Sequence, residues 1–435
     1  MSIAQLFYST TMNTTAVPQS RTDSALWHCQ AHMPTSTAKR LTVVGGDGAW
    51  LTTSTGQRLI DATAGLWHAN IGHGREEVAR AAYDQMVKLE TYHVFGCFAN
   101  EPALRLADRL AQMVPTAASK VMFTSGGSDA IDLACKLARR HWQLEGYPAK
   151  SIILSRQRAY HGLHAYGTSI TGLQYNRDGY GAESLVPETA RISADNIDMV
   201  RAEIESIGAS RIAAIIAEPV QGTGGIWPPS AGYLESLQEL SRENNIIFIV
   251  DEVITGFGRT GQMFASDRWN LSPDIIVMAK GITSGYAPLG AVAVSPRIAD
   301  RYFDSPDAPL FRHGLTYSGH ATACVVAETN LDIIEREGLV ARAAQLEGIL
   351  AEAVEPLRSH RLVRDVRAGA GFLAGIQLQP IVSGDAIAET VAASGVITRV
   401  IHDNTLQISP PFVVTSDEVQ FIADSIASAI DAYDA

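Results

Sequence analysis

The sequence predicts an α/β protein with a largely parallel main sheet that helices cover on both faces, followed by a smaller α+β unit. Two observations lead to this fold class. Short apolar runs alternate with helical patterns between about residues 120 and 295, as expected for strands buried in a parallel sheet. After about residue 331 the pattern changes to long amphipathic helices separated by short strands.

The expected elements follow one another along the chain. Residues 1–40 show little periodicity and are expected to form an arm, and a hairpin follows at 49–62. Helical spacing covers residues 76–89 and 101–113. Buried strands are expected at 120–124, 151–155, 211–220, 246–253, 274–280 and 290–295. We expect three parts: an arm with part of the small domain (1–65), a large domain (66–330) and a C-terminal small domain (331–435).

Composition argues against several classes of protein. The 435 residues carry a formal net charge of −12, whereas a nucleic-acid-binding face is normally basic. The four cysteines form no CxxC motif, and no basic segment precedes an apolar stretch at the N-terminus. No apolar run approaches the ~20 residues that cross a bilayer. We therefore expect a cytoplasmic protein that binds neither nucleic acid nor membrane.

Lys280 is the first candidate for chemistry. The chain has only six lysines, and Lys280 is the only one after Lys150. It ends an apolar strand and precedes the turn GITSG, at the end of a parallel sheet where ligands bind. A buried amine with a lowered pKa suits Schiff-base chemistry. An ordinary solvated lysine is the alternative.

Asp251 is the second candidate, because it follows five apolar residues of a buried strand. A carboxylate in that position needs a cationic partner. Taken alone, Asp251 is also compatible with a metal ligand, a helix cap or an internal salt bridge. Together with Lys280 it matches pyridoxal phosphate, which needs a lysine for its aldehyde and a carboxylate for its ring nitrogen.

Two other segments offer the remaining contacts that this cofactor needs. The glycine turn after strand 120–124 presents the amides of Gly127 and Ser128 at the start of a helix, where a phosphate can bind. An ordinary N-cap fits the same pattern. Tyr160 and His161 follow strand 151–155, and either can stack on a pyridine ring, although a core tyrosine is the alternative.

Three other motifs carry less weight. Residues 256–261 match GxGxxG, but no amphipathic helix opens after them. His161 and His164 lie three residues apart without an evident third ligand, so we expect no metal site. The chain contains no GK[ST] and no GxSxG motif, which argues against a P-loop NTPase and a serine hydrolase.

Six motifs in sequence order make the chain resemble the class III aminotransferases, which are pyridoxal-phosphate enzymes of fold type I. The motifs are Ser125–Ala130, Tyr160–Gly162, AEPVQGTGG, DEVITGFGRTG, AKGITSG and TYSGH. The resemblance implies a large domain on a mainly parallel seven-stranded sheet, a smaller α+β domain, and a homodimer with shared active sites. The segment AGLWHANIGHG is similar to the amine, β-alanine and taurine:pyruvate aminotransferase group.

The resemblance also implies roles for individual residues. Lys280 matches the Schiff-base lysine, and Asp251 matches the partner of the pyridinium nitrogen. The other implied cofactor contacts are Gly127 and Ser128 at the phosphate, Tyr160 and Val253 on the ring faces, Glu218 as a nearby acid, and Thr316 at the phosphate of the neighbouring subunit. The implied substrate contacts are Trp67, Tyr160 and Arg399.

Arg399 is expected to bind the carboxylate of the keto acid acceptor and to move aside for an amine that lacks a carboxylate. In the ornithine and 4-aminobutyrate enzymes a glutamate masks this arginine, and Thr223 stands at that position here. A structural surface arginine is the alternative. We therefore predict a transaminase that moves an amino group from a primary amine or ω-amino acid to an α-keto acid, with pyruvate expected. An aminomutase, a decarboxylating transaminase and a non-catalytic cofactor-binding protein are the alternatives.

Overall fold

The computed structural model describes residues 24–181, 184–304 and 306–434, so most of the expected N-terminal arm lies outside the described residues. The strands in these ranges form three sheets. Their bounds are β1 (Val43–Asp47), β2 (Trp50–Thr53), β3 (Arg58–Asp61), β4 (Lys120–Thr124), β5 (Ile152–Arg156), β6 (Thr189–Ile192), β7 (Ile212–Ala217), β8 (Ile247–Asp251), β9 (Ile275–Met278), β10 (Gly290–Val294), β11 (Val363–Arg367), β12 (Ala374–Leu378), β13 (Val396–Ile397), β14 (Val400–Ile401) and β15 (Thr405–Ile408).

Helices connect and cover these strands. Their bounds are α1 (Met33–Ala38), α2 (Ala64–Trp67), α3 (Glu76–Leu89), α4 (Glu101–Met113), α5 (Gly127–Leu144), α6 (Ala165–Ile170), α7 (Ile197–Ile207), α8 (Tyr233–Glu243), α9 (Ala265–Arg268), α10 (Pro296–Phe303), α11 (Ala321–Arg336), α12 (Leu339–Val354), α13 (Gly384–Ala393) and α14 (Ser416–Asp434). Among the described residues, no helix combines the length and the apolar character that a membrane crossing requires.

The largest sheet of the described chain has seven strands in the order β4-β10-β9-β8-β7-β5-β6. Strand β10 runs antiparallel to both of its neighbours, and the other pairings are parallel. The predicted mainly parallel sheet is therefore confirmed. The edge strand β6 was not expected, because three of its four residues are only partly buried and it lacks a long apolar run.

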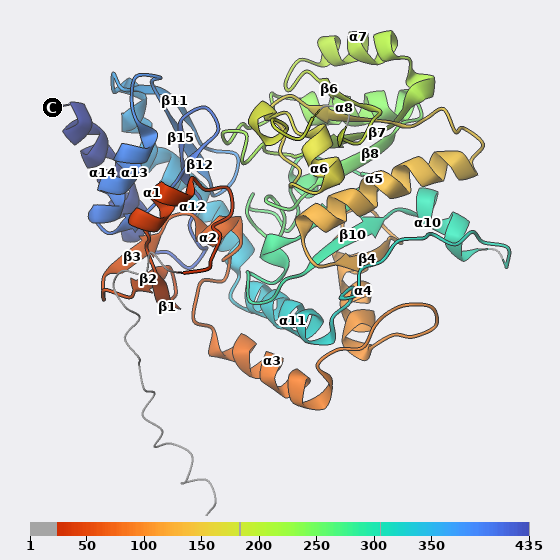
Figure 1. Cartoon of the computed structure of the whole chain (residues 1–435), viewed down its shortest axis with the longest axis horizontal. Coiled ribbons are helices and arrows are strands. Elements are labelled where there is room, and N and C mark those ends of the chain that lie inside the picture. Colours follow the sequence, from red (N-terminus) through yellow and green to blue (C-terminus); the bar gives the residue numbers. More distant parts are fainter. Residues whose placement is uncertain (1–23, 182–183, 305, 435) are drawn as a thin grey trace, which may run out of the picture.

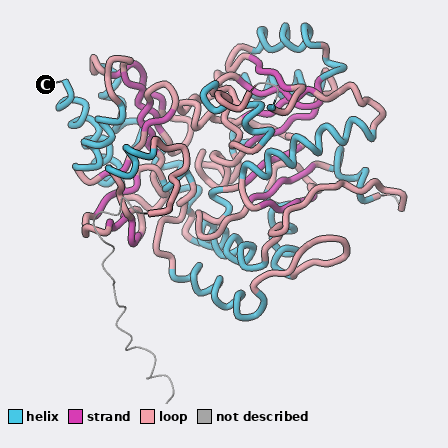
Figure 2. The backbone as a smooth tube through the Cα atoms, in the orientation of Figure 1, coloured by secondary structure: helices cyan, strands magenta, loops and turns pink. Residues whose placement is uncertain are grey.

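Helices cover both faces of this sheet (Figures 1 and 2). The period of two along β8 shows the arrangement, because successive side chains of a strand point to opposite faces. Ile247 and Ile249 pack in one cluster with α5 and α10, whereas Phe248 and Val250 pack in another with α7 and α8. A strand buried on both faces reads as the continuous apolar run seen in the sequence.

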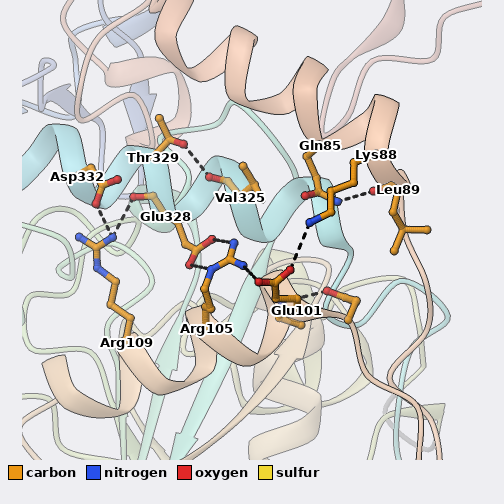
Figure 3. Close-up of polar contacts among 12 residues, drawn as sticks. Gln85, Lys88, Leu89, Glu101, Arg105, Arg109, Val325, Glu328, Thr329 and Asp332 are labelled. Carbon is orange, nitrogen blue, oxygen red and sulfur yellow. Dashed lines mark hydrogen bonds and ion pairs between the residues drawn. The ribbon is translucent and has the colours of Figure 1, made fainter.

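Helix α11 packs against α3 and α4, and Figure 3 shows the polar contacts between α4 and α11. Arg105 and Arg109 of α4 pair with Glu328 and Asp332 of α11, at 2.9 and 2.7 Å. Exposed ion pairs of this kind contribute less than about 1 kcal/mol each. The apolar residues that both helices bury in the largest core cluster therefore hold this layer together.

The two smaller sheets lie together on one side of the molecule (Figure 1). One has the order β1-β2-β3-β13, so a strand from the C-terminal part completes a sheet built from the N-terminal part. Ile60 of β3 pairs in parallel with Val396 of β13, and Lys39 forms an ion pair with Glu389. The other small sheet has the order β11-β12-β15-β14. The expected domain boundaries at about residues 65 and 330 stay a prediction.

Candidate active site

The loops at the carboxyl ends of β4, β5, β7, β8 and β9 enclose a cleft. It is lined by Gly127, Ser128, Ile131, Tyr160, His161, Gly162, Glu218, Val220, Asp251, Val253, Ile254 and Lys280. The cleft therefore contains every predicted cofactor residue except Thr316. Their convergence follows from the fold, because the carboxyl ends of parallel strands meet at one edge of the sheet.

Lys280 follows β9 in a left-handed backbone conformation, with φ of 49°. This conformation is unfavourable for a residue with a Cβ atom and is found mainly at functional sites. Burial lowers the pKa of its amine to about 8, the negative charge of Asp251 works against this shift, and the charge of Arg399 adds to it. Its Nζ has no hydrogen bond or ion pair within the described residues. The free amine is thus accessible near neutral pH.

Asp251 ends β8, and its carboxylate is held in one orientation. Its Oδ2 lies 2.7 Å from His161 Nδ1, and its Oδ1 accepts the backbone N–H of Val253 at 3.0 Å. His161 is almost fully buried, and its Nε2 has no partner among the described atoms. The sequence did not predict this pair, because His161 was considered only for stacking on the ring and for metal binding with His164. His164 instead contacts Asp129 at 3.1 Å, so the two histidines face different carboxylates.

Glu218 follows β7 and links two loops of the cleft. Its side chain accepts the backbone N–H groups of Tyr160 at 3.0 Å and Gly222 at 3.2 Å. Burial raises the pKa of this carboxyl to about 7, with the nearby charge of Asp251 adding to the shift and that of His161 opposing it. The sequence placed Glu218 inside a longer strand, but the sheet ends at Ala217, and this lets the side chain turn toward the loops.

The N-terminus of α5 opens into the cleft. No side chain caps it, so backbone N–H groups of its first turn are available to an anion and the helix dipole favours one. Space is tight here, since a Cβ atom on Gly127 would lie 3.1 Å from Val253 Cγ1. Gly162 is required beside it, because its φ is 82° and a Cβ atom there would lie 2.2 Å from Ser128 Oγ.

Trp67 lies next to the cleft without lining it. It packs with Val220 and Ile254, which do line it, and its indole Nε1 is buried without a hydrogen-bond partner among the described residues. The turn before it is strained, with φ of 68° at Trp67 itself. Buried Asp61 holds this turn by accepting the backbone N–H of Gly65 at 2.6 Å and the hydroxyl of Thr63 at 2.8 Å.

Arg399 and Thr316 also lie outside the lining of the cleft. Arg399 stands between β13 and β14, and its charge lowers the pKa of Lys280. It also opposes the rise that burial causes in the pKa of Tyr160, so the guanidinium is close to both residues. Thr316 is exposed in the segment between α10 and α11. Its predicted contact with a neighbouring subunit stays a prediction.

The GxGxxG match at residues 256–261 serves packing rather than dinucleotide binding. A Cβ atom on Gly258 would lie 2.9 Å from Phe412, and one on Gly261 would lie 3.0 Å from Ala344. Between them, buried Arg259 donates to the carbonyls of Phe372 and Pro410. These glycines therefore allow the C-terminal part of the chain to approach the loop after β8.

The cleft fits pyridoxal 5'-phosphate. Free N–H groups at the start of α5 suit its phosphate, and the immobilised carboxylate of Asp251 suits a protonated ring nitrogen. The unpaired amine of Lys280 suits its aldehyde. Val253 and Tyr160 border the space between these groups and offer an apolar and an aromatic surface to a ring.

Comparisons with known proteins agree with this chemistry. Residues 32–430 match the family model described as aminotransferase class-III. The chain is 35% identical to an omega-aminotransferase of Caulobacter vibrioides, with 89% of this chain and 92% of that protein covered. It is 32% identical to the beta-alanine–pyruvate aminotransferase of Pseudomonas aeruginosa, with 89% and 91% covered.

A solved structure gives the same result. The chain is similar to an amine transaminase from an uncultivated Pseudomonas species in the PLP-bound form, with 36% identity and a TM-score of 0.89. The likeness covers 94% of this chain and 99% of that one.

Proposed function

We propose that this chain, which belongs to the class III aminotransferases, moves an amino group from an ω-amino acid or primary amine to pyruvate. The family and the PLP-bound relative show that the chain is a pyridoxal-phosphate-dependent aminotransferase of fold type I. The observation that carries the proposal is the placement of the unpaired amine of Lys280 and the oriented carboxylate of Asp251 on one cleft.

The residues of the cleft divide the work among them. When bound, pyridoxal phosphate supplies an electrophilic carbonyl and a ring that accepts electrons. Lys280 would hold the aldehyde and move protons at its Nζ, because its lowered pKa leaves a fraction of the amine neutral near physiological pH. Asp251, oriented by His161, keeps a negative charge at the ring nitrogen.

The phosphate and the ring are held by other residues. We propose that the amides of Gly127 and Ser128 bind the phosphate and that Tyr160 and Val253 enclose the ring. The carboxylate of Glu218 accepts the backbone N–H of Tyr160 and so supports this residue. The substrate then meets Trp67 and Arg399 at the outer side of the cleft.

We also propose a homodimer in which Thr316 reaches the phosphate of the neighbouring subunit. Exposed aromatic side chains near this segment support the proposal, since Phe95, Phe98 and Tyr317 have exposed fractions of 47%, 52% and 63%, and such surfaces usually bind a partner. Mixing Lys280→Ala and Thr316→Ala subunits tests it. A shared site predicts that mixed dimers regain activity that neither variant has alone.

The proposal also includes the domain division and the location of the protein in the cell. The division at about residues 65 and 330 is supported by the pairing of β3 with β13, and limited proteolysis would test it. The cytoplasmic location expected from the sequence stays a proposal that cell fractionation would test.

Absorbance of the bound cofactor tests the activity directly. A transaminase predicts that the visible absorbance is lost with an amine donor and returns with pyruvate. A panel of donors against pyruvate and 2-oxoglutarate identifies the substrates. Release of carbon dioxide would instead indicate a decarboxylating reaction, and an unchanged spectrum with every donor would contradict the proposal.

A further inference from the structure

A chain of hydrogen bonds connects Arg399 to the turn that carries Trp67. Arg399 Nε donates to Gln407 Oε1 at 2.5 Å, and Gln407 Nε2 donates to Ser409 Oγ at 2.7 Å. Ser409 Oγ then donates to the backbone carbonyl of Thr63 at 3.4 Å. The same carbonyl accepts the backbone N–H of Trp67 at 3.1 Å. The two predicted substrate residues are therefore joined through buried side chains.

The amide of Gln407 has only one satisfactory orientation in this chain. Gln407 and Ser409 have exposed fractions of 0%, so water does not compete for their polar atoms. A guanidinium only donates hydrogen bonds, so it requires the carbonyl oxygen of Gln407. The hydroxyl of Ser409 donates to Thr63, so it remains free to accept from the NH₂ group. A flipped amide would lose both contacts.

This arrangement leaves the outer end of the Arg399 guanidinium free. Within the described residues its two terminal nitrogens have no hydrogen bond or ion pair. Burial lowers the pKa of Arg399, while Tyr160 and Tyr175 oppose the shift, and its charge is felt by Lys280. A partly buried guanidinium with two unused donors close to the cleft matches a bidentate contact with a carboxylate.

We propose that Gln407 is a positioning residue that keeps Arg399 in the carboxylate-binding orientation, and that the enzyme therefore prefers ω-amino acid donors to amines without a carboxylate. The inference rests on the proposed function, in which Arg399 meets the substrate. It adds a residue, Gln407, and a donor class that follows from it.

The preference arises from what each donor requires of Arg399. The carboxylate of an ω-amino acid binds the guanidinium where Gln407 already holds it. An amine with an apolar end requires the guanidinium to leave, because a charged group facing an apolar one is unfavourable. That movement strands the buried carbonyl oxygen of Gln407 without a donor, which is unfavourable as well.

A comparison of β-alanine with propylamine tests the proposal, because these donors differ only in a carboxylate replaced by a methyl group. The readout is the single-turnover rate of the absorbance change in the holoenzyme. We expect wild type to favour β-alanine, and Gln407→Leu to reduce this preference by about tenfold, the usual effect of losing a hydrogen bond to a charged group. The rate with propylamine should stay the same or rise.

Gln377→Leu is the matched control. Gln377 accepts a hydrogen bond from Arg367 at 2.8 Å and is nearly as buried as Gln407, but it does not contact Arg399. The control should leave the donor preference unchanged while losing a comparable interaction. Ser409→Ala should shift the preference in the same direction as Gln407→Leu and by less, because it only frees the amide to flip.

Equilibrium binding of propanoate to the holoenzyme gives a readout that does not depend on turnover. Its dissociation constant should rise about tenfold in Gln407→Leu and stay unchanged in Gln377→Leu. An unchanged donor preference in Gln407→Leu, an equal shift in the control, or a wild-type preference for propylamine would overturn the proposal. Gln407-dependent binding of propanoate by a protein that reacts with no donor would support the positioning role and refute the proposed function.

Discussion

At each end of the strands of the seven-stranded sheet lies one lysine whose pKa burial lowers, and the two lysines have contrasting surroundings. Lys280 follows β9 at the carboxyl end of the strands, and Lys150 precedes β5 at their amino end. Burial lowers the pKa of both amines to about 8. Lys150, however, donates to the carbonyl of Ala209 at 3.1 Å and lies 4.5 Å from the centre of the Trp142 ring, so its ammonium is occupied.

Two aspartates at the opposite ends of the strands differ in the same way, because one is paired and the other faces the cleft. Asp274 lies at the amino end of β9. It accepts the backbone N–H of Phe248 at 2.9 Å and pairs with Arg297 at 3.0 Å, so its carboxylate has a structural role. Asp251 contacts a histidine and faces the cleft. A lowered pKa therefore does not identify a nucleophile by itself. The unpaired amine and the open space before it distinguish Lys280.

Replacement of each of the two lysines by alanine should give the largest difference in activity. Lys280→Ala is expected to reduce turnover by about 10⁴-fold, because it removes the group that transfers protons. Borohydride should no longer fix the cofactor to the chain. Lys150→Ala should lower stability and keep the activity of the folded protein. Cofactor labelling that persists in Lys280→Ala would show that another lysine is the attachment site.

The two acids should differ by less. Asp251→Asn is expected to slow proton abstraction from the donor by about 10²- to 10³-fold, the usual effect of losing one preorganised electrostatic contact. Asp274→Asn should leave that rate unchanged in the folded protein. Single-turnover kinetics measure both variants, and a near wild-type rate in Asp251→Asn would remove the ring-nitrogen role.

Arg399 can be compared with Arg297, which pairs with Asp274 at the amino end of the strands. Arg399→Ala should weaken the interaction with pyruvate by about 2–5 kcal/mol, the range for a desolvated charge pair, and affect a simple amine donor much less. Arg297→Ala should affect neither half-reaction. The half-reactions measured separately would show the difference, and equal losses in both for Arg399→Ala would mean that this arginine does not sort substrates.

The smallest expected effect is a change in the pH dependence of stability. Lys150 has a pKa of about 8 in the folded chain against 10.5 as its ordinary value, so the burial penalty on its charge is fully present below about pH 8. Between pH 8 and 10.5 the unfolded state holds more protons, so the folded state gains stability as pH rises. Lys150→Met should lack this gain, which amounts to no more than about 3 kcal/mol.

Denaturant unfolding from pH 7 to 10.5 measures this difference in the free energy of unfolding. Parallel curves for wild type and Lys150→Met would mean that the hydrogen bond to Ala209 and the Trp142 ring keep the amine charged, and that burial does not dominate its titration.

Local patterns in the sequence were sufficient for the main sheet and for the residues at its strand ends. Lys280 and Asp251 could be selected because each is a charged residue that ends an apolar run, and the topology of a parallel sheet brings such ends together. The strand β6 was missed because it is short and buries only its last residue fully. The strand predicted at 211–220 was too long at its C-terminal end, because β7 ends at Ala217.

Contacts between distant side chains could not be predicted from the sequence. His161 and Asp251 are 90 positions apart, and no periodicity indicates that their side chains meet. Gln407 reads as an ordinary residue of a short strand, and its role follows only from Arg399 on one side and Ser409 on the other. The strained turn at Trp67 is equally hidden, because Asp61 enforces it through tertiary hydrogen bonds.

The bond between Ser409 and Thr63 has a consequence for how the protein is made. The two residues are 346 positions apart, and contacts of such long range form slowly because a large loop must close first. A ribosome completes the seven strands of the main sheet, up to Val294 of β10, well before it reaches Ser409. A nascent chain can therefore assemble its cofactor cleft while the Trp67 turn still waits for its C-terminal anchor. Holoenzyme formation should precede substrate competence during biosynthesis, with the cofactor acting as an early stabilising ligand.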